Sequence, residues 1–117
     1  MRARRLVRPW LLAVAATVAC SPIIRYTAIN ASPPAMTPRS PEAVEVFSSG
    51  PPTRPHVDVA LIEVEDPPFG VETAELLQSL RVRAAEAGCD GVVVTAIAVG
   101  RHDRRVMYGT CIRYVEP

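Results

Sequence analysis

Residues 72–99 read ETAELLQSLRVRAAEAGCDGVVVTAIAV, a helical pattern that runs directly into an apolar strand. Within 72–87 the apolar side chains recur at the spacing of one helical face. They are Leu76, Leu77, Leu80, Ala84 and Ala87. Gly88 stands where a helix C-cap is expected, and 91–99 is β-branched enough for a buried strand. The stretch therefore predicts a helix packed against a sheet.

Three further strands are predicted around this unit. They cover 44–47 (VEVF), 57–64 (VDVALIEV) and 106–115 (VMYGTCIRYV), with polar or proline-rich turns between them. The resulting order is strand, strand, helix, strand, strand (ββαββ). We therefore expect one small α+β domain over 43–117, with a mostly antiparallel sheet and the helix packed on one face.

The N-terminus has the pattern of an export signal. Four arginines and no acid precede Trp10, and residues 10–19 (WLLAVAATVA) are apolar apart from Thr17. A ten-residue helix spans only ~15 Å, about half of a ~30 Å hydrocarbon core, so a permanent transmembrane segment is not expected. We predict that residues 1–19 are a signal peptide that is removed.

Thr17-Val-Ala-Cys20 resembles the lipobox of bacterial lipoproteins, in which a small residue precedes a cysteine that is acylated after cleavage. The resemblance implies lipidation of Cys20 and insertion into the bilayer through its acyl chains. Ser21, in place of Asp, implies delivery to the outer membrane, facing the periplasm. The alternative is ordinary cleavage after Ala19, which leaves a free N-terminal cysteine.

Without the signal, the chain keeps nine arginines against 12 acids, a formal charge of −3. A mildly acidic domain with no basic patch argues against nucleic acid as a partner. Residues 21–42 contain five prolines and no glycine. We therefore predict that 20–42 is a lipid-anchored, proline-rich tether that holds the domain away from the membrane.

Cys89 and Cys111 are the remaining cysteines. In an oxidising compartment a disulfide is the simplest expectation, closing a loop of 22 residues and stabilising the fold by roughly 3 kcal/mol. A tight hairpin centred on Gly100 places the two cysteines opposite each other, whereas a full 100–105 loop requires a bend after Gly88. Free buried thiols, or a metal or redox role, are the alternatives.

The segments VEVF at 44–47, VALI at 59–62, AAEAGCDGVVV at 84–94 and YGTCIRY at 108–114 resemble the RcsF-like and YbjQ-like small α/β domains of bacteria. The likeness covers roughly residues 44–115. RcsF-like proteins are outer-membrane lipoproteins with a disulfide-held domain that senses envelope stress by contacting partner proteins. Cys111 matches a disulfide cysteine of that family, and two of the family's four domain cysteines are absent. The YbjQ-like resemblance implies heavy-metal binding as an alternative.

Neither histidine belongs to a recognisable catalytic or metal motif. His56 and His102 are expected in exposed turns, and their neighbours Asp58 and Asp103 could at most orient them. With Cys89 and Cys111 they form no CxxC or HxxxH cluster, so we predict no cofactor, no resident metal and no enzymatic activity.

The last strand carries the candidate partner-binding residues Tyr108, Arg113 and Tyr114. Tyr108 and Tyr114 share one face, and Cys111 and Arg113 share the other. We expect the tyrosine face to pack beneath the helix; the alternative is an exposed surface with tyrosine and arginine anchors. The sequence thus predicts a nonenzymatic envelope lipoprotein that binds a protein partner, as a stress sensor or assembly factor. A small metal-binding domain of YbjQ-like type is the second hypothesis.

Overall fold

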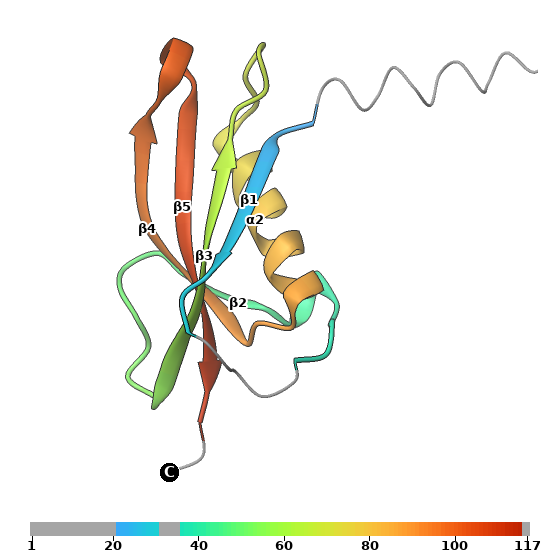
Figure 1. Ribbon diagram of the computed structural model, residues 1–117, viewed down its shortest axis with the longest axis vertical. Helices are drawn as coiled ribbons and strands as arrows, with labels where there is room; N and C mark the ends of the chain where they lie inside the picture. Colours follow the sequence, from blue (N-terminus) through green and yellow to red (C-terminus); the bar gives the residue numbers. More distant parts are fainter. Residues whose placement is uncertain (1–20, 31–35, 116–117) are drawn as a thin grey trace, which may run out of the picture.

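The computed structural model describes residues 21–30 and 36–115. The predicted signal peptide and Cys20 lie outside the described residues. One helix and five strands form the fold (Figure 1): β1 Ile23–Ala28, β2 Glu45–Phe47, β3 His56–Glu65, α2 Thr73–Ala87, β4 Gly91–Val99 and β5 Arg105–Tyr114. The prediction of an α+β domain with a helix packed on the sheet is confirmed. No helix in the described ranges is long and apolar enough to cross a membrane.

The strands form one mixed sheet in the order β1-β3-β5-β4-β2. Three pairings are antiparallel, and the short edge strand β2 runs parallel to β4. Strand β5 lies in the centre between β3 and β4, and successive residues of each strand alternate between the two faces of the sheet. The predicted boundaries of the four expected strands and of the helix agree with the structure to within one residue.

Strand β1 corrects the predicted tether over 20–42. Residues 23–28 pair with β3 from Ile23–Glu65 to Ala28–Ala60. Met36 then packs against the core, and the backbone N–H of Arg39 donates to the carbonyl of Ala85 at 2.9 Å. Pairing satisfies the backbone groups that an extended tether leaves to water. The folded domain therefore begins at β1 rather than at residue 43.

Helix α2 covers one face of β3 and β5, and its apolar stripe forms the core with them (Figure 1). Leu76, Leu80 and Ala84 are fully buried. Gly88 ends the helix with a φ of 85°, a left-handed conformation that glycine adopts at little cost. The guanidinium of Arg81 donates to the carbonyl of Val44 at 3.2 Å, which ties the helix to the start of β2.

The helix packs on the opposite face of β5 from the one expected. Gly109 faces Leu80, and a β-carbon added there would lie 2.9 Å from it. Cys111 has the same parity as Gly109, so it lies beneath the helix, whereas Tyr108 and Tyr114 lie on the other face. The expectation that the tyrosine face packs beneath the helix was therefore wrong.

Cys89 and Cys111 form a disulfide with a Cα–Cα distance of 5.7 Å. The β4–β5 register pairs Cys111 with Val92, and a bulge between Val94 and Ala96 shifts the strands relative to a simple hairpin. The left-handed Gly88 turns the chain so that Cys89 meets Cys111 from the end of the helix. The predicted bond is confirmed, and it uses the bend after Gly88 rather than a tight turn centred on Gly100.

A partly buried ion pair fixes the end of the sheet that carries the β4–β5 turn, which we call the hairpin end. Asp66 is 5% exposed, and its carboxylate accepts hydrogen bonds from the Arg105 backbone N–H at 3.0 Å and from Nε at 2.9 Å. Arg105 also donates to the Val71 carbonyl and to the Thr73 hydroxyl. The hydrogen bonds from the Arg105 side chain hold the pKa of Asp66 below its usual value. The loop of residues 66–72 is thereby held against β5.

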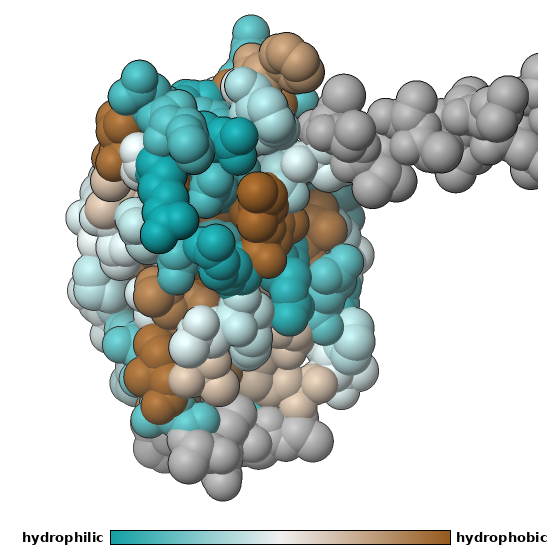
Figure 2. Space-filling view, turned by 45° about the horizontal axis from the view of Figure 1, so that its top comes forward, coloured by the Kyte–Doolittle hydropathy of each residue, from teal (hydrophilic) through white to brown (hydrophobic). Residues whose placement is uncertain are grey.

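The surface near the hairpin end is mixed. Figure 2, which brings this end forward, shows apolar groups standing between polar ones. Phe69, in the 66–72 loop, is 95% exposed, and Val99, at the end of β4, is 70% exposed.

Candidate functional site

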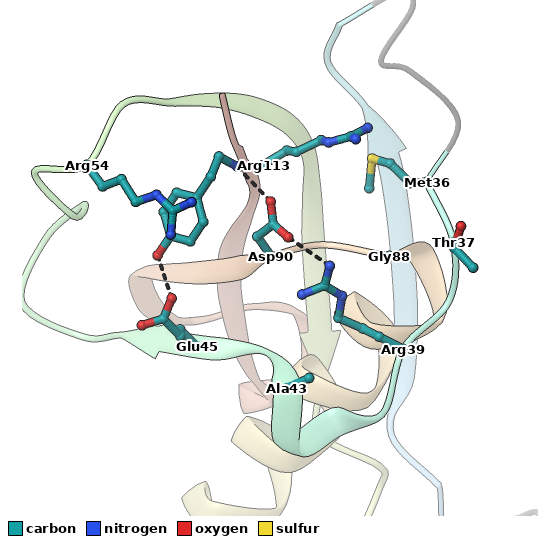
Figure 3. A pocket seen from close by; sticks show the side chains of 10 residues that line it. Met36, Thr37, Arg39, Ala43, Glu45, Arg54, Gly88, Asp90 and Arg113 are labelled. Carbon is teal, nitrogen blue, oxygen red and sulfur yellow. Dashed lines mark hydrogen bonds and ion pairs between the residues drawn. The ribbon is translucent and has the colours of Figure 1, made fainter. Parts of the chain in front are cut away.

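A polar hollow of about 530 Å³ lies at the end of the sheet opposite the hairpin end. We call it the arginine pocket, and Figure 3 shows that side chains enter it from several separate segments. It is lined by Met36, Thr37, Arg39, Ala43, Glu45, Arg54, Gly88, Asp90, Arg113 and Tyr114.

One wall of the arginine pocket is built on the end of α2. A β-carbon at Gly88 would lie 2.7 Å from the carbonyl oxygen of Thr37 and 2.9 Å from the β-carbon of Met36. Only glycine allows this close approach together with a positive φ. Residues 36–39 therefore lie directly on the helix cap.

Asp90, the residue after the disulfide-bonded Cys89, links two of the segments that line the pocket. Its Oδ2 accepts the Tyr114 backbone N–H at 2.7 Å, and its Oδ1 lies 2.8 Å from Nη2 of Arg39. The adjacent Cys89 is fixed by its bond to Cys111. One carboxylate thus joins the end of β5 to the segment before β2 (Figure 3).

Tyr114 forms the second polar contact of the pocket. Its hydroxyl donates to Oε1 of Glu45 at 2.6 Å, and the guanidinium carbon of Arg54 lies 3.9 Å from the ring centroid. Burial, followed by the hydrogen bond to Glu45, raises the pKa of Tyr114 to about 12. The phenol therefore stays protonated at neutral pH and remains a donor.

The structure separates the three candidate residues of the last strand. Arg113 and Tyr114 line the arginine pocket, whereas Tyr108 lies in a shallow hollow near the hairpin end with Arg25 and Arg104. Sequence reasoning missed Arg39, Arg54 and Asp90, because strand patterns carry no information on which loops meet at one end of a sheet.

The histidines are placed apart. His56 is the first residue of β3 rather than a loop residue, and its Nδ1 lies 2.8 Å from the carbonyl oxygen of Arg54. His102 is exposed in the β4–β5 turn, as expected. Within residues 21–30 and 36–115, no three His, Cys, Asp or Glu side chains are grouped so as to hold a metal ion. The disulfide also removes both of its cysteines as thiolate ligands.

Comparison with known proteins supports the fold alone. The crystal structure of the Francisella virulence factor FvfA, in its orthorhombic form, is similar with a TM-score of 0.55 at 11% sequence identity. The match covers 78% of this chain and 97% of that chain. No protein-family model matches the chain, and no curated protein sequence does either.

Proposed function

We propose that this chain is a nonenzymatic lipoprotein of the bacterial cell envelope whose domain binds a protein partner through the arginine pocket. The observation that carries the proposal is the composition of that pocket. Three arginines, a tyrosine and a methionine line it together with two carboxylates. Arg, Tyr and Met are the residues that protein interfaces favour.

The form of the pocket fits a protein partner better than a small metabolite. Small-molecule sites are mostly apolar clefts with a few convergent polar groups. Here the lining is predominantly polar, the Arg54 guanidinium stacks on the Tyr114 ring, and the Tyr114 hydroxyl donates to Glu45. Anchors that are already ordered lose little conformational entropy on binding. Three guanidinium groups against the carboxylates of Glu45 and Asp90 leave the lining with a formal charge of +1, so an acidic or carboxylate-bearing segment of the partner is its complement.

The proposed cell-envelope location rests on the N-terminal sequence and on the disulfide. Cys20 follows the export pattern and the lipobox-like Thr17-Val-Ala. The Cys89–Cys111 bond is typical of proteins that work in an oxidising compartment. The resemblance of 44–115 to RcsF-like domains agrees with a sensor or assembly role at the outer membrane.

Site-specific photocrosslinking in intact cells tests the partner. A benzophenone side chain in place of Ala43 samples the pocket, and one in place of the exposed Gln78 on α2 is the control. We expect a discrete crosslinked protein from Ala43 only, and its loss in the additional variant Arg54→Glu. The matched charge control, Arg83→Glu, lies on α2 outside the pocket and should leave the crosslink unchanged.

The magnitude can be checked once the partner is purified. A central interface arginine contributes about 2 kcal/mol, so Arg54→Glu should weaken binding by about 30-fold. Equal weakening by Arg54→Glu and Arg83→Glu would show that only the net charge matters, and the pocket would then be excluded as the binding site.

Fractionation tests the anchor separately. Cys20→Ala should release a folded, soluble domain, because the disulfide and the sheet do not depend on Cys20. Retention of this variant in the membrane, or an unacylated mass for the unaltered protein, contradicts the lipoprotein assignment.

A further inference from the structure

Strand β1 leaves very little chain between the proposed anchor and the folded domain. Cys20 precedes Ile23, the first residue of β1, by three residues. Three residues span at most ~11 Å even when fully extended. An acylated Cys20 therefore keeps the start of β1, and with it the hairpin end, within about 11 Å of the lipid headgroups.

The register of the sheet shows what else lies at that end. Ile23 pairs with Glu65, which pairs with Val106 on β5. The backbone N–H of Asp66 donates to the carbonyl of Arg105 at 2.9 Å. Val99, at the end of β4, is the strand-pairing partner of the same Arg105. The start of β1 and the end of β4 are three strand spacings apart, about 14 Å. The 66–72 loop, which follows β3 beside β1, and the β4–β5 turn beyond it therefore lie at the same end of the sheet as the start of β1 (Figure 1).

Exposed apolar side chains stand at this end. Phe69 is 95% exposed, Val99 is 70% exposed and Ile23 is 43% exposed. Phe69 is presented by a tight turn, in which the Gly70 N–H donates to the Pro67 carbonyl at 2.8 Å. Two prolines and the Asp66–Arg105 pair hold this turn in place. A phenylalanine that is 95% exposed to water is not explained by packing within the domain.

Three of the acids at this end are paired with arginines. Glu65 lies 3.5 Å from Arg104, and Glu63 lies 3.7 Å from Arg25. Asp66 is paired with Arg105. The aliphatic stems of these arginines can lie along apolar surface while the guanidinium reaches phosphate groups. Glu72, in the 66–72 loop, and Asp103, in the β4–β5 turn, are exposed acids of the same end.

We infer that the hairpin end rests on the lipid bilayer, with Phe69 and Val99 inserted at the boundary between headgroups and acyl chains. This inference rests on the proposed lipoprotein function. Strand β3 runs ten residues from one end of the sheet to the other, so the arginine pocket faces away from the membrane at a height of roughly 30 Å. The domain is docked on the membrane and presents its pocket to the periplasm.

Single-tryptophan fluorescence tests the docking. Trp10 is the one tryptophan of the sequence and lies in the predicted signal, so Phe69→Trp and Val99→Trp give reporters without background. Val115→Trp, beyond the end of β5, is the matched control. The protein is purified from membranes and reconstituted into phospholipid vesicles. In a second arm, a chain beginning at Cys20 is coupled through that thiol to maleimide-lipid vesicles; Cys89 and Cys111 are bridged and do not react.

We expect the emission of Phe69→Trp and Val99→Trp to shift to shorter wavelength on vesicles and to be quenched by lipids brominated near the glycerol. Val115→Trp should show neither change. Vesicle-bound protein whose Phe69→Trp emission stays that of a water-exposed indole overturns the inference. So does emission that is already shielded without vesicles, because another protein surface then covers the patch. If the protein from cells has an unacylated mass while the chain coupled to maleimide-lipid vesicles still docks, the lipoprotein function is contradicted and the docking inference stands.

Discussion

Removal of the Cys89–Cys111 disulfide should destabilise the domain by about 3 kcal/mol. The bond joins residues separated by 22 positions, and closing a loop of that length removes roughly this much chain entropy from the unfolded state. Typical domains are stable by about 5–15 kcal/mol, so the reduced protein should remain folded under native conditions. The effect is nevertheless a large fraction of the total stability.

Urea unfolding followed by circular dichroism, with and without reductant, measures the difference. With a urea m-value of about 1–3 kcal/mol/M, the midpoint should fall by about 1–3 M on reduction. The double variant Cys89→Ala, Cys111→Ala lacks the same cross-link and also two fully buried sulfur atoms. Its stability should lie slightly below that of the reduced protein, and the gap measures packing alone. A difference below about 1 kcal/mol between oxidised and reduced protein would falsify the argument that the bond acts through the unfolded chain.

Three further predictions concern single side chains. The pKa of Tyr114 is raised from 10.0 to about 12, so the stability that this shift contributes is complete below pH 10 and is lost as the pH rises towards 12. In Tyr114→Phe, the unfolding free energy should therefore depend less on pH between pH 10 and pH 12 than in the unaltered protein. The lowered pKa of Asp66 acts in the opposite direction, because its contribution is present above the usual value of 3.8 and is lost in acid. Asp66→Asn should therefore lose less stability than the unaltered protein between pH 7 and pH 3, and an equal loss contradicts the assignment. Gly109→Ala places a methyl group 2.8 Å from Val92 and 2.9 Å from Leu80; overpacking should cost about 1–3 kcal/mol in a thermal or urea unfolding experiment, and an unchanged midpoint would show that the core can yield there.

The helix and four strands could be predicted because each carries its own periodic pattern. Strand β1 could not be separated from its proline-rich surroundings, although Ile24, Tyr26 and Ala28 alternate towards the core side of the sheet. That period of two was a usable signal. The prolines at residue 22 and beyond residue 32 indicated a tether more strongly than this alternation indicated a strand. A six-residue strand offers only three positions on each face, so its alternation is a weak signal.

The face of β5 that meets the helix was beyond sequence reasoning for a different reason. Met107 and Cys111 are buried beneath α2, yet Val106 and Ile112 are also buried on the other face. A strand that is apolar on both faces gives no alternation from which to choose a side. Tertiary packing decides which face the helix covers.

The arginine pocket shows the same limit more strongly. Arg39, Arg54 and Asp90 come from three connections between elements, and Tyr114 ends the last strand. Each position alone is an ordinary polar residue. Only the parallel pairing of β2 with β4 and the turn at Gly88 bring these positions to one end of the sheet.

The antiparallel pairing of β1 with β3 has a mechanical consequence. If the chain is held at Cys20 and a partner pulls on the opposite end of the sheet, the force runs along β1 and slides it past β3. Six residue pairs, from Ile23–Glu65 to Ala28–Ala60, then bear the load together instead of opening one after another. All backbone hydrogen bonds of the β1–β3 pairing are therefore loaded in parallel under shear. Tension between membrane and partner is transmitted through an intact sheet until β1 detaches in one cooperative step.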